Sequence, residues 1–146
     1  MLFRSTTADD IDKMMNKKSG MLGISGKTSD NQEIGKLAEA GDERAVLIEK
    51  MYAHQITKFV GSYVAAMGGA DAIVFTGGIG ENAGSYRAKV CEKLAFLGIT
   101  IDAEKNKVRG EEIEISTPDS KVKVFVIPTN EELVIARDTK AIVEAL

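Results

Sequence analysis

The chain has 146 residues, of which 44% are hydrophobic and 28% are charged, and its formal net charge is −3. This length suffices for a single globular domain with a buried core. The mildly acidic balance and the absence of lysine and arginine runs exclude a protein that wraps nucleic acid, and no apolar stretch approaches the ~20 residues of a membrane-spanning helix. One cysteine and one histidine exclude an internal disulfide and a Cys/His-ligated zinc site, and they fit a cytoplasmic protein.

The first half of the sequence predicts helices and one glycine-rich loop. Ser29, with Gln32 three residues later, forms the pattern of a capping box, and Asp42 is a second candidate N-cap. Apolar residues at steps of three and four extend the helix that Asp42 begins to about Met67. The predicted elements are three helices at residues 7–20, 29–41 and 42–67, and an irregular loop at residues 20–28.

The second half predicts strands that alternate with helices. The apolar, β-branched run Ala72–Thr76 and the run Val122–Ile127 predict two buried strands. Thr129, with Glu132 three residues later, forms another capping-box pattern, from which a helix runs to the C-terminus. The other predicted elements are a helix at residues 83–97 and short strands at residues 99–101 and 113–115. This order predicts an α/β fold in which crossover helices join parallel strands.

A glycine-rich turn, Gly77–Asn82, joins the first strand to the helix that follows it. A strand that ends in glycines and continues as a helix leaves N–H groups beside the positive end of a helix dipole. Glycines also let the backbone approach a ligand closely. The turn, called the glycine turn below, therefore suits a phosphate or another polar part of a nucleotide.

Three interpretations of the glycine turn fit the sequence. In a dinucleotide-binding (Rossmann) fingerprint, Gly78, Gly80 and Ala83 satisfy the pattern G-x-G-x-x-A. Asp102 then stands about where an acidic residue would meet a ribose hydroxyl. The turn also fits the nucleotide turn of an actin-type kinase, or a tight connection that binds no ligand.

A second strand-to-helix turn, Pro128–Glu132, repeats this arrangement. In open α/β sheets ligands gather beyond the carboxyl ends of strands, and a lone carboxylate there would hold Mg²⁺ mainly through water. Alternatively, Glu131 and Glu132 only complement the helix dipole. Gly26-Lys27-Thr28 looks like the end of a P-loop, but Met21 stands where that motif needs a glycine.

Three motifs together resemble the acetate kinase family, within the acetate and sugar kinase, Hsp70 and actin superfamily. They are NKKSGMLGISG (16–26), FTGGIGEN (75–82) and PTNEELVIARD (128–138). The resemblance implies the C-terminal part of an actin-like ATPase (ribonuclease H-like) domain. Residues 1–146 would be a single nucleotide-binding segment of a two-domain kinase, with 1–69 mostly helical and 70–146 arranged βαβα. The implied reaction is ATP + acetate ⇌ ADP + acetyl phosphate by Mg²⁺-assisted phosphoryl transfer.

The resemblance also implies roles for particular residues. The adenosine end of an ATP site would be formed by Gly78, Ile79, Gly80, Glu81 and Asn82. Asp30, Asn31 and Gln32 occupy the place of a second nucleotide segment, where the family commonly has Asp, an apolar residue and Arg. Glu131 looks like the family's magnesium-associated glutamate.

No catalytic residue is expected in this chain, because the family's residues that position acetate and stabilise the transferred phosphoryl group lie upstream. The resemblance therefore implies a chain that is inactive alone. The strand Ala72–Thr76 would pair with Val122–Ile127 and leave its other edge free, which predicts self-association or a homodimer. The alternatives are a non-catalytic nucleotide-binding or interaction module and, less favoured, a Rossmann fragment.

Overall fold

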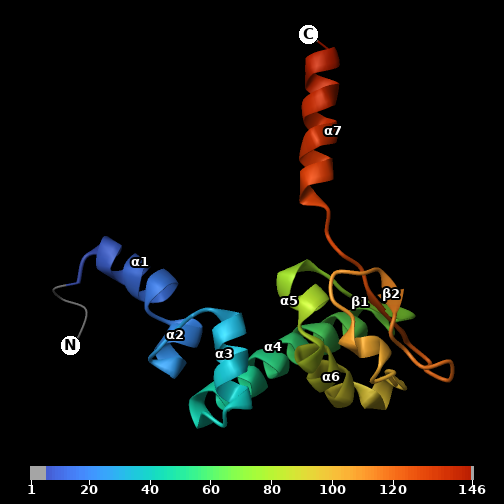
Figure 1. Ribbon diagram of the computed structural model, residues 1–146, viewed down its shortest axis with the longest axis horizontal. Helices are drawn as coiled ribbons and strands as arrows, with labels where there is room; N and C mark the ends of the chain where they lie inside the picture. Colours follow the sequence, from blue (N-terminus) through green and yellow to red (C-terminus); the bar gives the residue numbers. More distant parts are fainter. Residues whose placement is uncertain (1–5, 146) are drawn as a thin grey trace. The chain divides into compact units, whose positions relative to one another are not determined.

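The computed structural model (Figure 1) describes residues 6–145. The chain divides into two compact units, and the boundary falls between Ile56 and Thr57 in the sequence. Each unit is described by itself. The first unit contains α1 (Ala8–Lys17), α2 (Gly20–Ser25), α3 (Asn31–Glu39) and the first part of α4 (Glu43–Met67). Within the described part of the chain, no helix combines the length and the apolar character that crossing a membrane requires.

Local capping interactions explain where the helices of the first unit begin. Thr7 and Asp10 form a complete capping box at α1. The predicted capping residue of α3 is wrong by one position, because the carboxylate of Asp30, not Ser29, accepts the N–H groups of Gln32 and Glu33. Residues 20–28 are not wholly irregular either, since α2 forms within them. Its helical turn ends at Gly26, which has a positive φ of 65°.

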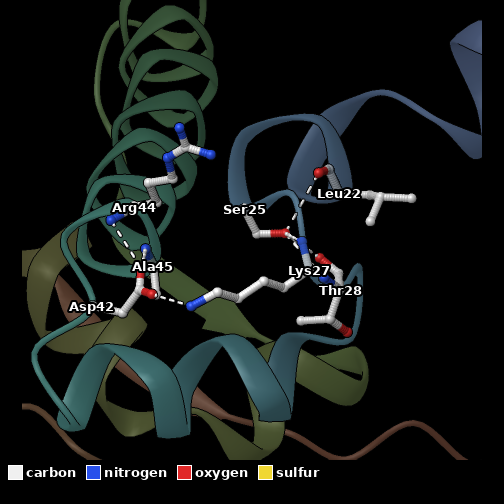
Figure 2. A network of polar contacts seen from close by, with 7 residues as sticks. All are labelled: Leu22, Ser25, Lys27, Thr28, Asp42, Arg44 and Ala45. Atoms are coloured by element: carbon white, nitrogen blue, oxygen red, sulfur yellow. Dashed lines mark hydrogen bonds and ion pairs between the residues drawn. The ribbon is translucent and has the colours of Figure 1, made fainter.

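The core of the first unit is small and apolar, and a polar network closes the turn beside it. Ile34, Ala45 and Ile48 are buried there, and Met21, Ile24, Leu37 and Ala38 pack against them. Figure 2 shows the network around Asp42, whose carboxylate accepts the N–H groups of Arg44 and Ala45, both at 3.0 Å, and an ion pair from Lys27 at 2.6 Å. Asp42 therefore caps α4, as predicted.

The network also explains the Gly26-Lys27-Thr28 sequence. The Ser25 hydroxyl accepts the N–H groups of Lys27 and Thr28, both at 3.0 Å, and donates to the Thr28 carbonyl at 2.7 Å (Figure 2). The turn thus satisfies its own amides, and a helix, α2, precedes it instead of a strand. These residues do not form a P-loop.

The second unit is built on a three-stranded sheet in the order β1-β3-β2. β1 (Ala72–Phe75) pairs with β3 (Lys123–Val126) in parallel, as predicted, whereas β2 (Ile113–Glu114) pairs with β3 antiparallel. The expectation of parallel strands throughout was therefore wrong for β2. Of the predicted strand at 99–101, only Ile101 forms a bridge, with Ser116.

The helices of the second unit differ from the prediction at the glycine turn. The glycine turn is itself a short helix, α5 (Gly77–Asn82), and the expected helix at 83–97 is divided into α6 (Gly84–Lys93) and the 3-10 turn η1 (Ala95–Leu97). A second 3-10 turn, η2, covers Lys105–Lys107. The last helix, α7, runs from Glu131 to Glu144.

One face of α6 and the sheet supply the core of the second unit. The buried apolar side chains are Tyr86, Val90, Cys91, Leu94, Ile99, Ile115, Val122, Val124 and Val126. Cys91 is a small buried residue, as its apolar neighbours predicted, and burial raises the pKa of its thiol to about 11. α7, in contrast, buries none of its residues.

Candidate nucleotide site

The candidate site lies at the edge of the sheet where two parallel strands end. β1 and β3 pair in register up to Phe75 opposite Val126, and the N–H of Ile127 donates to the carbonyl of Phe75 at 3.0 Å. Both strands therefore end at the same edge of the sheet, where β1 continues into the glycine turn and β3 continues into Pro128–Glu132. Ligands of open α/β sheets bind at this edge.

Each glycine of the turn meets a different requirement. Gly77 has a positive φ of 71°, which disfavours any side chain. A Cβ on Gly80 would lie 3.2 Å from the carbonyl carbon of Phe75, so Gly80 allows the turn to pack on the strand end. A Cβ on Gly78 would meet nothing within 4 Å, and Gly78 is exposed, so this peptide is open to a ligand.

The side chains of the glycine turn differ in how far they are exposed to solvent. Asn82 is exposed and donates through Nδ2 to the carbonyl of Gly78 at 3.0 Å, which closes the turn on itself. Ile79 is half-buried. Thr76 is the N-cap of α5 but makes no side-chain capping bond. Because the first N–H groups of a helix lack intrahelical partners, those of Gly78 and Ile79 remain for a ligand or water.

Glu81 contacts protein groups of both turns. Its Oε1 accepts the N–H of Gly77 at 2.9 Å, the N–H of Thr129 at 2.7 Å and the hydroxyl of Thr129 at 3.0 Å. These bonds, led by that from the Thr129 backbone, hold the pKa of Glu81 below its ordinary value of 4.5. Thr129 is consequently not the predicted cap of α7, whose first turn is capped by Asn130 through Leu133 N–H at 3.0 Å.

Arg87, which the sequence analysis did not single out, holds the other end of the glycine turn. It is fully buried, and its Nη1 donates to the carbonyls of Gly80 at 2.7 Å and Glu81 at 2.9 Å. A cation at the carbonyl end of α5 complements the helix dipole. Desolvation by burial lowers the pKa of Arg87, although the guanidinium stays charged at neutral pH.

The remaining donors of Arg87 bind the segment around η2. Nε donates to Asn106 Oδ1 at 2.9 Å, and Nη2 donates to the carbonyls of Asn106 at 2.7 Å and Val108 at 2.9 Å. All five N–H donors of the guanidinium are thus used. Arg87 also stands at helical spacing from the buried Val90, Cys91 and Leu94. This position on the apolar face of α6 is the feature of the sequence from which its burial could have been predicted.

Two neighbouring residues bear on the competing interpretations. A Cβ on Gly84 would lie 2.6 Å from the carbonyl oxygen of Asn106, so Gly84 permits the close approach of α6 to η2. The carboxylate of Asp102 accepts the N–H groups of Glu104 at 2.8 Å and Lys105 at 3.1 Å. Asp102, which the Rossmann interpretation places at a ribose hydroxyl, therefore stabilises a local turn through its carboxylate.

The second predicted nucleotide segment lies in the first unit. The Asp30 carboxylate caps α3, Asn31 is the first residue of that helix, and Gln32 is exposed. The glycine turn and Glu131 lie in the second unit. Asp30, Asn31 and Gln32 therefore form one contiguous helix start, in which Asp30 and Gln32 are exposed and Asn31 is half-buried, and which is separate in the chain from the paired turns.

Glu131 is the first residue of α7 and is exposed. Because Asn130 provides the helix cap, the Glu131 carboxylate is not needed for that purpose. Among residues 6–145, no cluster of three or more His, Cys, Asp or Glu side chains could enclose a metal ion. A single exposed carboxylate nevertheless fits Mg²⁺, which keeps several waters and commonly binds one or two carboxylates together with substrate phosphates.

Comparison with known proteins gives consistent matches over nearly the whole chain. The model of the acetokinase family matches residues 3–137. The acetate kinase of Methanosarcina thermophila is 55% identical over 138 residues, which are 94% of this chain and 34% of that protein. The acetate kinase of Dictyoglomus thermophilum is 55% identical over 133 residues, 91% of this chain and 33% of that protein. This chain thus spans about a third of these relatives.

Solved structures agree with the sequence matches. The crystal structure of Porphyromonas gingivalis acetate kinase superposes with a TM-score of 0.85 at 51% identity, covering 94% of this chain and 35% of that one. A propionate kinase from Francisella tularensis superposes with a TM-score of 0.79 at 45% identity, covering 89% of this chain and 33% of that one. The mixed α/β arrangement is therefore one that solved acyl kinases contain.

Proposed function

The chain belongs to the acetokinase family, and from that premise we propose that it carries the adenosine side of the ATP site of an acetate kinase. The whole enzyme would catalyse ATP + acetate ⇌ ADP + acetyl phosphate. The paired turns at one sheet edge carry this proposal, because they bring exposed backbone amides and the exposed Glu131 to the two strand ends. The fold in this proposal is the C-terminal part of an actin-like ATPase domain.

In the proposed site the glycine turn binds the adenosine end of ATP. Gly78 presents an unobstructed peptide, Ile79 lies beside the base, and Asn82 closes the turn. Arg87 supports these residues from the buried side through the carbonyls of Gly80 and Glu81. The turn is therefore held in place before a ligand arrives, which lowers the entropic cost of binding.

Glu131 would hold Mg²⁺ through water or directly, and the metal would neutralise phosphate charge during transfer. Asp30, Asn31 and Gln32 would form the second nucleotide segment. Gln32 is neutral and lacks the planar cation of an arginine, so this segment would contribute less to binding phosphate or stacking on a base than an arginine would.

We propose that this 146-residue chain does not turn over acetate by itself. Phosphoryl transfer depends almost wholly on positioning and charge stabilisation. The groups proposed to position acetate and stabilise the phosphoryl group are not among the site residues assigned to this chain. We further propose a cytoplasmic location, which suits the buried free thiol of Cys91, and self-association through the free edge of β1.

The test is an assay of ADP formation from acetate and Mg-ATP with the purified chain. The proposal expects no turnover above that of a Glu131→Ala variant, which serves as the control for contaminating kinase. Turnover that the Glu131→Ala substitution abolishes would overturn the proposal of inactivity. Calorimetry with ADP and with NAD separates the other candidates, because a Rossmann fragment would prefer NAD and a purely structural segment would bind neither.

A further inference from the structure

One carboxylate oxygen joins two segments that are far apart in the sequence. Oε1 of Glu81 accepts both the N–H and the hydroxyl of Thr129, 48 residues away, and also the N–H of Gly77 at the start of α5. Hydrogen bonds to an ionised carboxylate are about twice as strong as neutral ones. Glu81 is therefore bonded to its own turn and to the neighbouring one by the same atom.

Thr129 is well placed to transmit a constraint to the segment that contains Glu131, the residue proposed to hold the metal. It immediately precedes Asn130, whose side chain caps α7, and it stands two residues before Glu131. Fixing the Thr129 peptide therefore fixes the direction in which the chain enters α7. The hydroxyl adds a second bond to the N–H, so the Thr129 residue is held at two points.

The contacts differ from those of a core residue. Thr129 is exposed and Glu81 is only half-buried, so removing these bonds admits water to the released amides instead of leaving them unsatisfied in the interior. Loss of the carboxylate should consequently release the second turn without unfolding the unit. Arg87, in contrast, is fully buried and supports the core of the unit as well as the turn.

We infer that Glu81 is a positioning residue whose carboxylate ties the glycine turn to the Thr129 turn, so that nucleotide bound at the first is sensed at the second. The inference rests on the proposed function, since it takes the glycine turn as the nucleotide segment and Glu131 as the metal-associated residue. It changes the role of Glu81 from a direct ligand contact to the link between the two segments.

Amide hydrogen exchange of the ligand-free chain tests the link itself. In Glu81→Gln the amide oxygen can still accept these hydrogen bonds but without charge assistance, and exchange of the Gly77 and Thr129 amides should accelerate roughly tenfold. Glu92→Gln is the matched control, because it removes the same charge at an exposed position near the C-terminal end of α6, and it should leave both rates unchanged. Thr129→Ser keeps the hydroxyl and should retain the wild-type rates, whereas Thr129→Val should lose part of the protection. Equal rates in Glu81→Gln and the wild type would overturn the inference.

The same experiment with ADP and no added metal tests positioning. In the wild-type chain ADP should slow exchange in Gly78–Asn82 and also at Thr129. In Glu81→Gln the effect should persist in the glycine turn and become smaller at Thr129, a separation that a merely stabilising residue would not produce. An ADP effect at Thr129 that keeps its wild-type size in Glu81→Gln would contradict the inference. No ADP effect anywhere in the wild type would instead contradict the proposed function, and the ligand-free comparison would then decide the inference by itself.

Discussion

Replacing Arg87 tests whether a single buried cation holds the glycine turn to the body of the second unit. Arg87 donates five hydrogen bonds, two to the end of α5 and three to the segment at Asn106 and Val108. Lysine offers three donors from a single nitrogen and cannot reproduce the planar fork of the guanidinium. At least two of the carbonyl and amide acceptors would therefore lose their partners.

The size of the effect follows from those lost bonds. A hydrogen bond to a charged group contributes about 1.5–3 kcal/mol, so with partial relaxation we expect Arg87→Lys to destabilise the second unit by about 2–4 kcal/mol. This is a large share of the stability of an ordinary domain, roughly 5–15 kcal/mol. Arg87→Met leaves every acceptor without its donor and should destabilise at least as much.

Cys91 provides a local assay, because it is the only cysteine in the chain and is buried in the same unit. At pH 8 a thiol reagent reacts with Cys91 only when the unit opens, so the labelling rate reports the opening free energy. Since 1.4 kcal/mol corresponds to a tenfold change, Arg87→Lys should accelerate labelling by about 30- to 700-fold. Arg109→Lys, the same exchange at an exposed arginine, is the control and should change the rate little.

Two results would refute the reasoning about Arg87. Labelling of Arg87→Lys at the wild-type rate would mean that the five bonds do not stabilise the unit. Equal acceleration in Arg109→Lys would mean that the effect comes from exchanging any arginine for lysine and not from the buried contacts of Arg87.

Three further predictions follow from the second unit. Gly84→Ala should destabilise the unit by about 2 kcal/mol or more and speed Cys91 labelling, because its Cβ would lie 2.6 Å from a carbonyl oxygen. Gly78→Ala should leave the labelling rate unchanged and weaken ADP binding in calorimetry. Faster labelling in Gly78→Ala than in Gly84→Ala would contradict the assignments. Glu81 has a folded pKa below its unfolded value of about 4.5, so its bonds contribute fully above the unfolded pKa and are lost as the pH falls through the folded one. Amide protection at Thr129, corrected for intrinsic exchange, should therefore decrease as the pH falls below 4.5, and protection that stays constant over the whole acid range in which the unit remains folded would refute this. The free edge of β1 should drive self-association in sedimentation velocity, reduced by Val74→Lys; a monodisperse wild-type monomer would contradict it.

The sequence predicted most elements correctly where local signals determine them. The long helix α4 begins at the predicted cap, Asp42, and ends at Met67 because apolar periodicity and terminal glycines are local properties. The pairing of β1 with β3 was also predicted, from the resemblance to a known superfamily. The β1 and β3 strands and their turns then define the candidate site.

The errors concern interactions between distant residues. Glycines are poor helix formers, so the sequence did not predict the short helix α5. Glu81 accepts the first N–H of this helix from within it, whereas Arg87, which donates to the carbonyl of Gly80, lies in the next helix, α6. Thr129 has the sequence pattern of a helix cap, yet its hydroxyl binds Glu81, 48 residues away, and Asn130 becomes the cap. The role of Arg87 could have been inferred only from its position among buried residues of α6.

The most direct test of the account is a titration of the isotopically labelled chain with ADP, followed by NMR of the backbone amides. The account predicts that ADP shifts the amides of Gly78–Asn82, that NAD shifts them less at equal concentration, and that Glu81→Gln retains these shifts. Addition of Mg²⁺ to the ADP-bound chain should then shift Glu131. An ADP response absent from Gly78–Asn82, or a stronger response to NAD there, would contradict the assignment of the glycine turn as the adenosine side of an ATP site.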